Sequence, residues 1–216
     1  MNNQQVAKYY AQLGEALEDK YLEPDMDEDI DDMSIHLGNV LAGHKVLELG
    51  CGTGFWTEVA AESAESVLAV DINPSLIEIA RERPMTEGKV TFRVADALDL
   101  PEDIGSFTAV LVSFLWSHLN KKEQEQLLAT LKKRLAKDTL LVILDDAFVE
   151  GFSETIARTD PDGTTYQILS TPEGERFEVA KSYQSDSALR KRLGTTVKEI
   201  KIERIEFFWI LTCRLK

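Results

Sequence analysis

The stretch KVLELGCGTGFWTEV, residues 45–59, decides the fold. Its first five residues read as a buried strand, glycines occupy positions 50, 52 and 54, and a helical pattern follows from Trp56 to Ala64. A tight turn without side chains lets a ligand lie against bare backbone, and the free N–H groups of the next helix attract negative charge. The stretch therefore predicts a strand, a ligand-binding turn and a helix. The alternative is a turn that simply needs small residues.

Apolar runs recur after this turn. They span residues 66–72, 89–96, 106–116 and 139–146, and helical patterns lie between them. Asn73 and Pro74 suit the N-cap and first position of one helix, and Asn120 with Glu123 forms a capping box for another. Strands that alternate with helices are joined by right-handed crossovers into a parallel sheet that is covered on both faces. We therefore expect an α/β fold with a doubly wound sheet.

The pattern changes on either side of this region. Residues 4–19 carry apolar side chains at helical spacing and predict an amphipathic helix that acts as a lid. A hairpin is expected at 164–180 and a helix near 186–193. The last two strands lie too close in sequence for a crossover helix, so we expect them to be antiparallel to each other.

We expect one domain over residues 1–216, built from four parts. These are a cap at 1–43, a ligand-binding core at 44–146, an insertion with hairpin and helix at 147–196, and a terminal strand pair at 197–216.

The charge and composition exclude several classes of partner. The sequence has 24 Lys and Arg against 38 Asp and Glu, a net charge of −14, which repels a phosphate backbone and argues against a nucleic-acid partner. The longest apolar stretch, 109–116, is too short to cross a bilayer, and the N-terminal residues lack the order of a signal peptide. We therefore expect a cytoplasmic protein without a membrane partner. Cys51 and Cys213 imply no disulfide framework.

Much of the acidity lies in EPDMDEDIDD, residues 23–32, where seven of ten positions are Asp or Glu. The spacing is similar to the start of a calcium loop. However, Ile30 stands where such a loop needs glycine, and His36 stands where it needs glutamate. We expect a solvated, mobile linker instead.

Residues near the glycine turn indicate which ligand it takes. The glycines follow GxGxG with Phe55 next, which matches neither the dinucleotide fingerprint nor the P-loop. Glu48 would repel phosphates and suits an ammonium or sulfonium group. Asp71, at the end of the second strand, can accept both hydroxyls of a ribose, and Asp96, at the end of the third, can accept the amine of an adenine. Together these groups describe S-adenosylmethionine.

The sequence resembles the class I S-adenosylmethionine-dependent methyltransferases through VLELGCGTG, VLAVDINP, VTFRVADALDLP and FTAVLVSFLWSHL. The resemblance covers residues 45 to about 145 and implies a seven-stranded, mostly parallel sheet whose last strand is inserted antiparallel. It also implies that Asp71 holds the ribose and that Ile72 packs on the adenine. The other cofactor-binding residues that it implies are Glu48, Gly50, Cys51, Gly52, Gly54 and Ser113 on the methionine side, and Asp96 and Ala97 at the adenine.

Methyl transfer depends mainly on positioning, and a general base is needed only for an acceptor that arrives protonated. His118 follows the fourth strand and is the candidate base or substrate contact, with a hydrogen-bonded loop histidine as the alternative. Aromatic residues have two possible roles, as the lining of an acceptor pocket or as core. They are Tyr9, Tyr10, Trp56 and Trp116.

The acceptor is expected to be a small molecule, and no metal is expected. Asp145 and Asp146 resemble the carboxylates of metal-assisted catechol methyltransferases, but residues 113–119 hold no further acidic ligand. The Asn-Pro-Pro-aromatic and Pro-Cys signatures of nucleobase-modifying relatives are missing. Two alternatives stay open: a protein that binds the cofactor or its demethylated product without transfer, and a nicotinamide oxidoreductase, which Glu48 and Phe55 disfavour. The sequence gives no oligomeric state.

Overall fold

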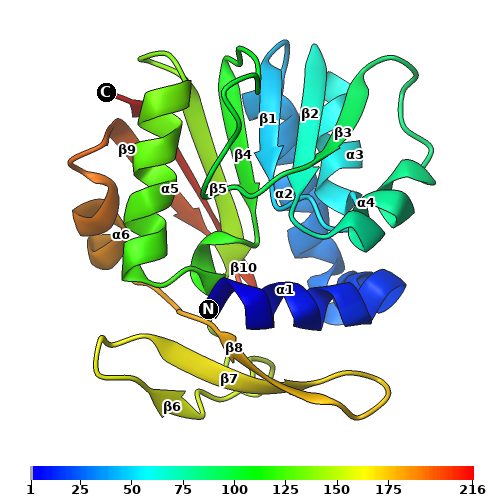
Figure 1. Cartoon of the computed structure of the whole chain (residues 1–216), viewed down its shortest axis with the longest axis vertical. Helices are drawn as coiled ribbons and strands as arrows, with labels where there is room; N and C mark the ends of the chain where they lie inside the picture. Colours follow the sequence, from blue (N-terminus) through cyan, green and yellow to red (C-terminus); the bar gives the residue numbers. More distant parts are fainter. Residues whose placement is uncertain (1) are drawn as a thin grey trace.

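The computed structural model describes residues 2–216, and within this range the core is a seven-stranded sheet in the order β3-β2-β1-β4-β5-β10-β9 (Figure 1). The first five strands of this sheet along the chain pair in parallel; they are β1 (Lys45–Leu49), β2 (Ser66–Asp71), β3 (Val90–Val94), β4 (Ala109–Ser113) and β5 (Leu140–Asp146). The strand β10 (Phe208–Leu215) pairs antiparallel with both β5 and β9 (Val197–Arg204). The expected sheet and its antiparallel last strand are confirmed.

Helices cover both faces of this sheet, as expected for a doubly wound fold. One face carries α5 (Lys121–Arg134) and α6 (Asp186–Leu193); the other carries α2 (Asp27–Leu41), α3 (Phe55–Ser63) and α4 (Pro74–Arg81) (Figure 1). Side chains of β1 alternate between the two cores, with Val46 on the α3 side and Leu47 on the α5 side. Both cores therefore hold β1 rigidly, and the turn after it has a fixed position.

The helices α5 and α4 begin where the sequence predicted, but only α5 has the expected side-chain cap. At α5, the Asn120 side chain accepts from the backbone N–H of Glu123, whose own side chain accepts in return, so the capping box is confirmed. Asn73 occupies the N-cap position of α4 but its side chain does not cap the helix. Its amide donates to the carbonyl of Ala7, 3.1 Å away, and so joins the N-terminal segment to the core.

The cap over the carboxyl end of the sheet differs from the one expected at 1–43: it consists of two segments that are far apart in sequence, and α2 packs against the sheet instead. The N-terminal segment is α1 (Asn2–Leu13) followed by a 3₁₀ helix, η1 (Gly14–Leu22), so the single helix expected at 4–19 breaks at Gly14, where φ is +54°. The second segment is the expected hairpin, β7 (Thr165–Ser170) and β8 (Arg176–Ala180), with a short third strand, β6 (Arg158–Thr159), that the sequence did not reveal. Figure 1 shows α1 between the carboxyl end of the large sheet and this hairpin.

A small apolar core joins the two cap segments. Val6 and Tyr9 of α1 are buried against Phe177 and Val179 of β8. The cap therefore has its own hydrophobic packing, separate from the two cores of the large sheet.

The prediction of a mobile linker at residues 23–32 is wrong. Pro24–Met26 form a 3₁₀ turn, and the acidic residues that follow open the helix α2. Asp27, Glu28 and Asp29 fill its first turn, where the helix dipole favours negative charge, and Asp29 Oδ2 accepts from the backbone N–H of Phe207 at 2.7 Å. Among residues 2–216, no helix is both long and apolar enough to span a membrane.

Candidate functional site

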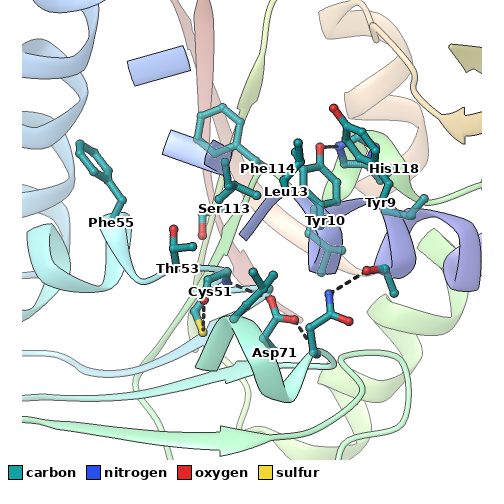
Figure 2. Close-up of a pocket in the computed structure, with 18 of the residues that line it drawn as sticks. Tyr9, Tyr10, Leu13, Cys51, Thr53, Phe55, Asp71, Ser113, Phe114 and His118 are labelled. Atoms are coloured by element: carbon teal, nitrogen blue, oxygen red, sulfur yellow. Dashed lines mark hydrogen bonds between the residues drawn. The ribbon is translucent and has the colours of Figure 1, made fainter. Parts of the chain in front are cut away.

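A cavity of about 300 Å³ lies at the carboxyl ends of β1, β2 and β4, under the cap (Figure 2). The glycine turn and the ends of β2 and β4 form its floor, and α1 and η1 form its roof. Tyr10 and His118 close one side. This is the crevice at which open parallel sheets bind their ligands.

The three glycines of the turn all have left-handed backbone. Their φ angles are +76° at Gly50, +55° at Gly52 and +89° at Gly54. A Cβ at Gly54 would lie 3.0 Å from the Cβ of Ala80, and one at Gly50 would lie 3.3 Å from the Cβ of Leu115. Backbone conformation and packing therefore require these glycines, in addition to the close approach of a ligand that we expected from the sequence.

Cys51 lies inside this turn and lines the cavity. Burial, together with the nearby carboxylates of Glu48 and Asp71, raises the pKa of its thiol well above the ordinary value. The thiol therefore stays protonated, which fits a small residue in a tight turn better than a nucleophile.

Asp71 holds the turn to the end of β2. Its Oδ2 accepts from the N–H of Gly52 at 2.9 Å, and its Oδ1 accepts from the N–H of Asn73 at 2.8 Å. Burial raises the pKa of this carboxyl, whereas the two backbone donors act in the opposite direction. Each carboxylate oxygen can accept a second hydrogen bond, and the residue lines the cavity, so the hydroxyls of a ribose can be held here.

The residues expected at an adenine lie in an adjoining hollow. Asp96 and Ala97 line a smaller cavity of about 50 Å³, which shares Gly50, Asp71 and Ile72 with the main cavity. Asp96 Oδ1 accepts from the N–H of Leu98 at 2.8 Å, which orients the carboxylate. The two cavities adjoin at Asp71 and Ile72 and together form a groove, with Asp96 in its smaller part.

Glu48 lies behind the wall of the cavity. The structure buries it completely, and its carboxylate accepts from the hydroxyls of Thr57 at 2.5 Å and Ser113 at 2.9 Å. Burial raises its pKa to about 7. Among the described residues, Ser113 lines the cavity and Glu48 does not, so Glu48 acts on the cavity wall through the Ser113 hydroxyl.

His118 is buried at the side of the cavity, between the core and the cap. Its Nδ1 lies 2.6 Å from the carbonyl oxygen of Ala180, and its Nε2 lies 2.7 Å from the hydroxyl of Tyr10 (Figure 2). Burial and the charge of Lys181 lower the pKa of the imidazole to about 4. The ring is therefore neutral at physiological pH.

The two carboxylates that end β5 contact a lysine. Lys181 Nζ lies 2.5 Å from Asp146 Oδ2 and 3.4 Å from Asp145 Oδ1, and it also contacts the Ser117 hydroxyl at 2.8 Å. Burial opposes both charges, yet the attraction holds the pKa of Asp146 below and that of Lys181 above its ordinary value. This cluster joins the insertion to the core, and no local sequence signal pointed to Lys181.

The aromatic residues divide between the two roles that the sequence left open. Tyr9, Tyr10 and Trp56 line the cavity. Trp116 is completely buried in the core and donates its indole N–H to Gln184 at 3.2 Å, so it has no role in the cavity wall. Sequence reasoning missed Phe114, which follows β4 with a left-handed φ of +53° and also lines the cavity.

Lys20 is a further cavity residue that the sequence did not reveal. Its ammonium lies 3.9 Å from the centre of the Phe114 ring and 3.6 Å from Asp146 Oδ1. It comes from η1, so the cap brings a positive charge to the cavity wall.

Comparison with known proteins supports the resemblance to methyltransferases that the sequence showed. Residues 46–138 match a family model described as a methyltransferase domain. A demethylmenaquinone methyltransferase of Clavibacter sepedonicus is 40% identical over 74 residues, 34% of this chain and 30% of the relative. A magnesium-protoporphyrin O-methyltransferase of Rhodobacter capsulatus is 45% identical over 69 residues, 31% of each chain. These matches span about a third of the length of the relatives.

The fold is matched over nearly the whole chain by a solved DhpI–SAH complex. The TM-score is 0.80 at 21% identity, and the match covers 98% of this chain and 96% of the other. The likeness therefore includes the cap segments as well as the sheet.

Proposed function

The chain carries a methyltransferase domain of the class I S-adenosylmethionine-dependent family, and from this premise we propose that it is an enzyme that methylates a small molecule. The observation that carries the proposal is the groove beneath the cap. Asp71 ends β2 and Asp96 follows the neighbouring strand β3, and both line this groove together with Gly50 of the glycine turn.

These residues fit S-adenosylmethionine. Asp71 is oriented by two backbone N–H groups and keeps acceptor capacity for the ribose, while Asp96 and Ala97 would meet the adenine. Ile72 would pack on the adenine face, and Ser113 would contact the methionine portion. The carboxylates of Asp71 and Asp96 suit a cationic ligand better than a phosphate.

When bound, S-adenosylmethionine supplies a methyl group that a positively charged sulfur has already activated. The chain's own task is then to orient the acceptor and to exclude water, and such positioning can contribute on the order of 7 to 11 kcal/mol. The cap residues Tyr9, Tyr10 and Leu13 would separate the reacting groups from solvent.

The acceptor is proposed to be a small molecule because the cavity lies beneath a cap and is lined largely by apolar and aromatic groups. The net charge of −14 argues against nucleic acid. The relatives named above carry names that point to small acceptors, a quinone precursor and a porphyrin.

Calorimetry with S-adenosylmethionine, S-adenosylhomocysteine and NAD tests the cofactor. We expect binding of the first two and none of NAD, with weaker binding in Asp71→Ala. Transfer of a labelled methyl group to an extract of small metabolites then tests catalysis. Binding without methyl transfer would instead support a non-catalytic binding protein. If the wild-type protein binds neither S-adenosylmethionine nor S-adenosylhomocysteine, the proposal is refuted.

A further inference from the structure

Tyr10 and His118 form a directional hydrogen-bonded pair. The carbonyl oxygen of Ala180 can only accept, so Nδ1 of His118, 2.6 Å away, must carry the ring proton. A neutral imidazole has one N–H, which leaves Nε2 as an acceptor. The Tyr10 hydroxyl, 2.7 Å from Nε2, therefore donates to it.

Both side chains line the cavity, but they come from different parts of the chain. Tyr10 belongs to α1 in the cap, and His118 follows β4 in the core. Their rings meet edge to face, with centres 5.3 Å apart, and Figure 2 shows the hydroxyl directed at the imidazole. The phenolic oxygen still has acceptor capacity, which is available to a molecule in the cavity.

Burial, modified by the neighbouring charged groups, keeps this pair neutral before the reaction. Burial and Lys181 outweigh Asp145 and Asp146 and lower the pKa of His118 to about 4. Burial raises the pKa of Tyr10, and Tyr9 and Asp146 act in the same direction against Lys181 and Lys20. Tyr10 therefore holds its proton, and His118 stays free to accept one.

Resting on the proposed function, we propose that Tyr10 is a catalytic residue and that the acceptors of this enzyme are hydroxyl compounds. The acceptor O–H donates to the Tyr10 oxygen while Tyr10 donates to Nε2 of His118. As the acceptor oxygen forms its bond to the methyl carbon, the carbon–sulfur bond breaks and its electron pair stays on sulfur. The acceptor proton passes to Tyr10, and the Tyr10 proton passes to His118.

The charge balance of this step explains why the imidazole of His118 can accept the proton although its pKa is low. The positive charge of the sulfonium disappears as the imidazolium forms, so the net charge of the closed site is unchanged. Asp145 and Asp146 favour the protonated ring, and both lie close enough to raise its pKa. Hydroxyl acceptors need such a relay, whereas amines attack as neutral groups and thiols ionise readily in water.

The geometry can be tested without turnover. The chain has three histidines, and ¹⁵N-imidazole NMR with His118→Gln as the assignment variant identifies the signal of His118. We expect a neutral Nδ1–H tautomer at pH 6, and a shift of the Nε2 resonance in Tyr10→Phe but not in the control Tyr166→Phe, which removes a hydroxyl on β7. A proton on Nε2 would overturn the proposal.

Kinetics then test the role in catalysis. The probes are catechol and 4-hydroxybenzoate as phenols, glycolate as an aliphatic hydroxyl, benzylamine as an amine and 2-mercaptoethanol as a thiol, each with labelled S-adenosylmethionine. We expect methylation of a hydroxyl probe and a fall in kcat of roughly 100-fold in Tyr10→Phe. His118→Gln should lower kcat similarly, and the double variant should be no slower than the slower single variant.

The outcomes separate this inference from the proposed function. Absence of S-adenosylmethionine binding in calorimetry refutes the proposed function itself. If the protein binds S-adenosylmethionine but Tyr10→Phe keeps the wild-type kcat, the inference about Tyr10 is overturned and the proposed function stands. Transfer to benzylamine or 2-mercaptoethanol rather than to hydroxyls, or to none of the probes, also overturns it. Tyr166→Phe should keep the wild-type kcat.

Discussion

The substitution Glu48→Gln should stabilise the protein above neutral pH. Glu48 is completely buried and its pKa is raised by burial from 4.5 to about 7. Folded protein therefore keeps the Glu48 proton between these values, while unfolded protein releases it, so stability from this group is lost as the pH rises from 4.5 to 7. At about 1.4 kcal/mol for each pKa unit, the full loss is about 3 kcal/mol.

Glutamine is a suitable replacement because the two partners of Glu48 are hydroxyls. Thr57 and Ser113 each donate to the carboxylate, and a hydroxyl can rotate to accept instead. The neutral amide then avoids the cost of a buried charge while it keeps both contacts.

Urea unfolding at pH 5 and pH 8, followed by circular dichroism, measures the effect. The stability advantage of Glu48→Gln over the wild type should grow by about 2.5 kcal/mol between the two pH values. The exposed Glu87→Gln variant is the control and should follow the wild type. Parallel stability curves for Glu48→Gln and wild type would refute the raised pKa.

The same variant tests the role that the resemblance implies for Glu48. An ionised Glu48 close to the methionine side of the cavity would favour the cationic S-adenosylmethionine over its neutral product. Glu48→Gln should therefore lose part of this preference at pH 8, as measured by calorimetry with both ligands. An unchanged ratio of the two affinities would mean that the carboxylate only supports Ser113 and the turn.

Three further substitutions test other parts of the site. Asp71→Ala should weaken S-adenosylmethionine binding by about 1 to 3 kcal/mol in calorimetry, because a charged hydrogen-bond acceptor is lost, and unchanged affinity would contradict its role. Gly54→Ala should lower the unfolding free energy, measured in urea, more than the control Gly88→Ala. Both glycines have positive φ, but a Cβ at Gly54 would lie 3.0 Å from the Cβ of Ala80, whereas one at Gly88 would meet open space. Equal losses in the two variants would refute the packing argument. Lys181→Met should lower the unfolding free energy by about 3 to 5 kcal/mol, because it leaves the buried Asp145 without its cation, and a smaller loss at pH 7 than at pH 4 would contradict the ion pair.

The sheet and its ligand edge could be predicted because their signals are local. The five apolar runs from Lys45 to Asp146 became the five parallel strands, and positive φ angles at Gly50, Gly52 and Gly54 account for the glycines between the first strand and its helix. The polar residues expected at strand ends do lie at one edge, because the carboxyl ends of parallel strands meet there.

What the sequence did not reveal depends on contacts between distant residues. The helix at Asp27 was hidden because its acidic first turn is typical of a linker as well as of a helix N-terminus. The pairing of Lys181 with Asp145 and Asp146 has no periodic or motif signal, and the burial of Glu48 depends on hydroxyls from a helix and another strand. Such contacts follow from the fold and not from local propensity.

The small core shared by α1 and β8 has a consequence for the order in which the protein matures. Val6 and Tyr9 are synthesised before all the strands of the large sheet, whereas Phe177 and Val179, which cover them, are made after β5. Until β8 has been made, the first helix therefore lacks the partner for its apolar face. The roof of the cavity therefore depends on a segment made much later than the helix that forms it, so a nascent chain can enclose a ligand only after β8 has been synthesised and has docked on α1.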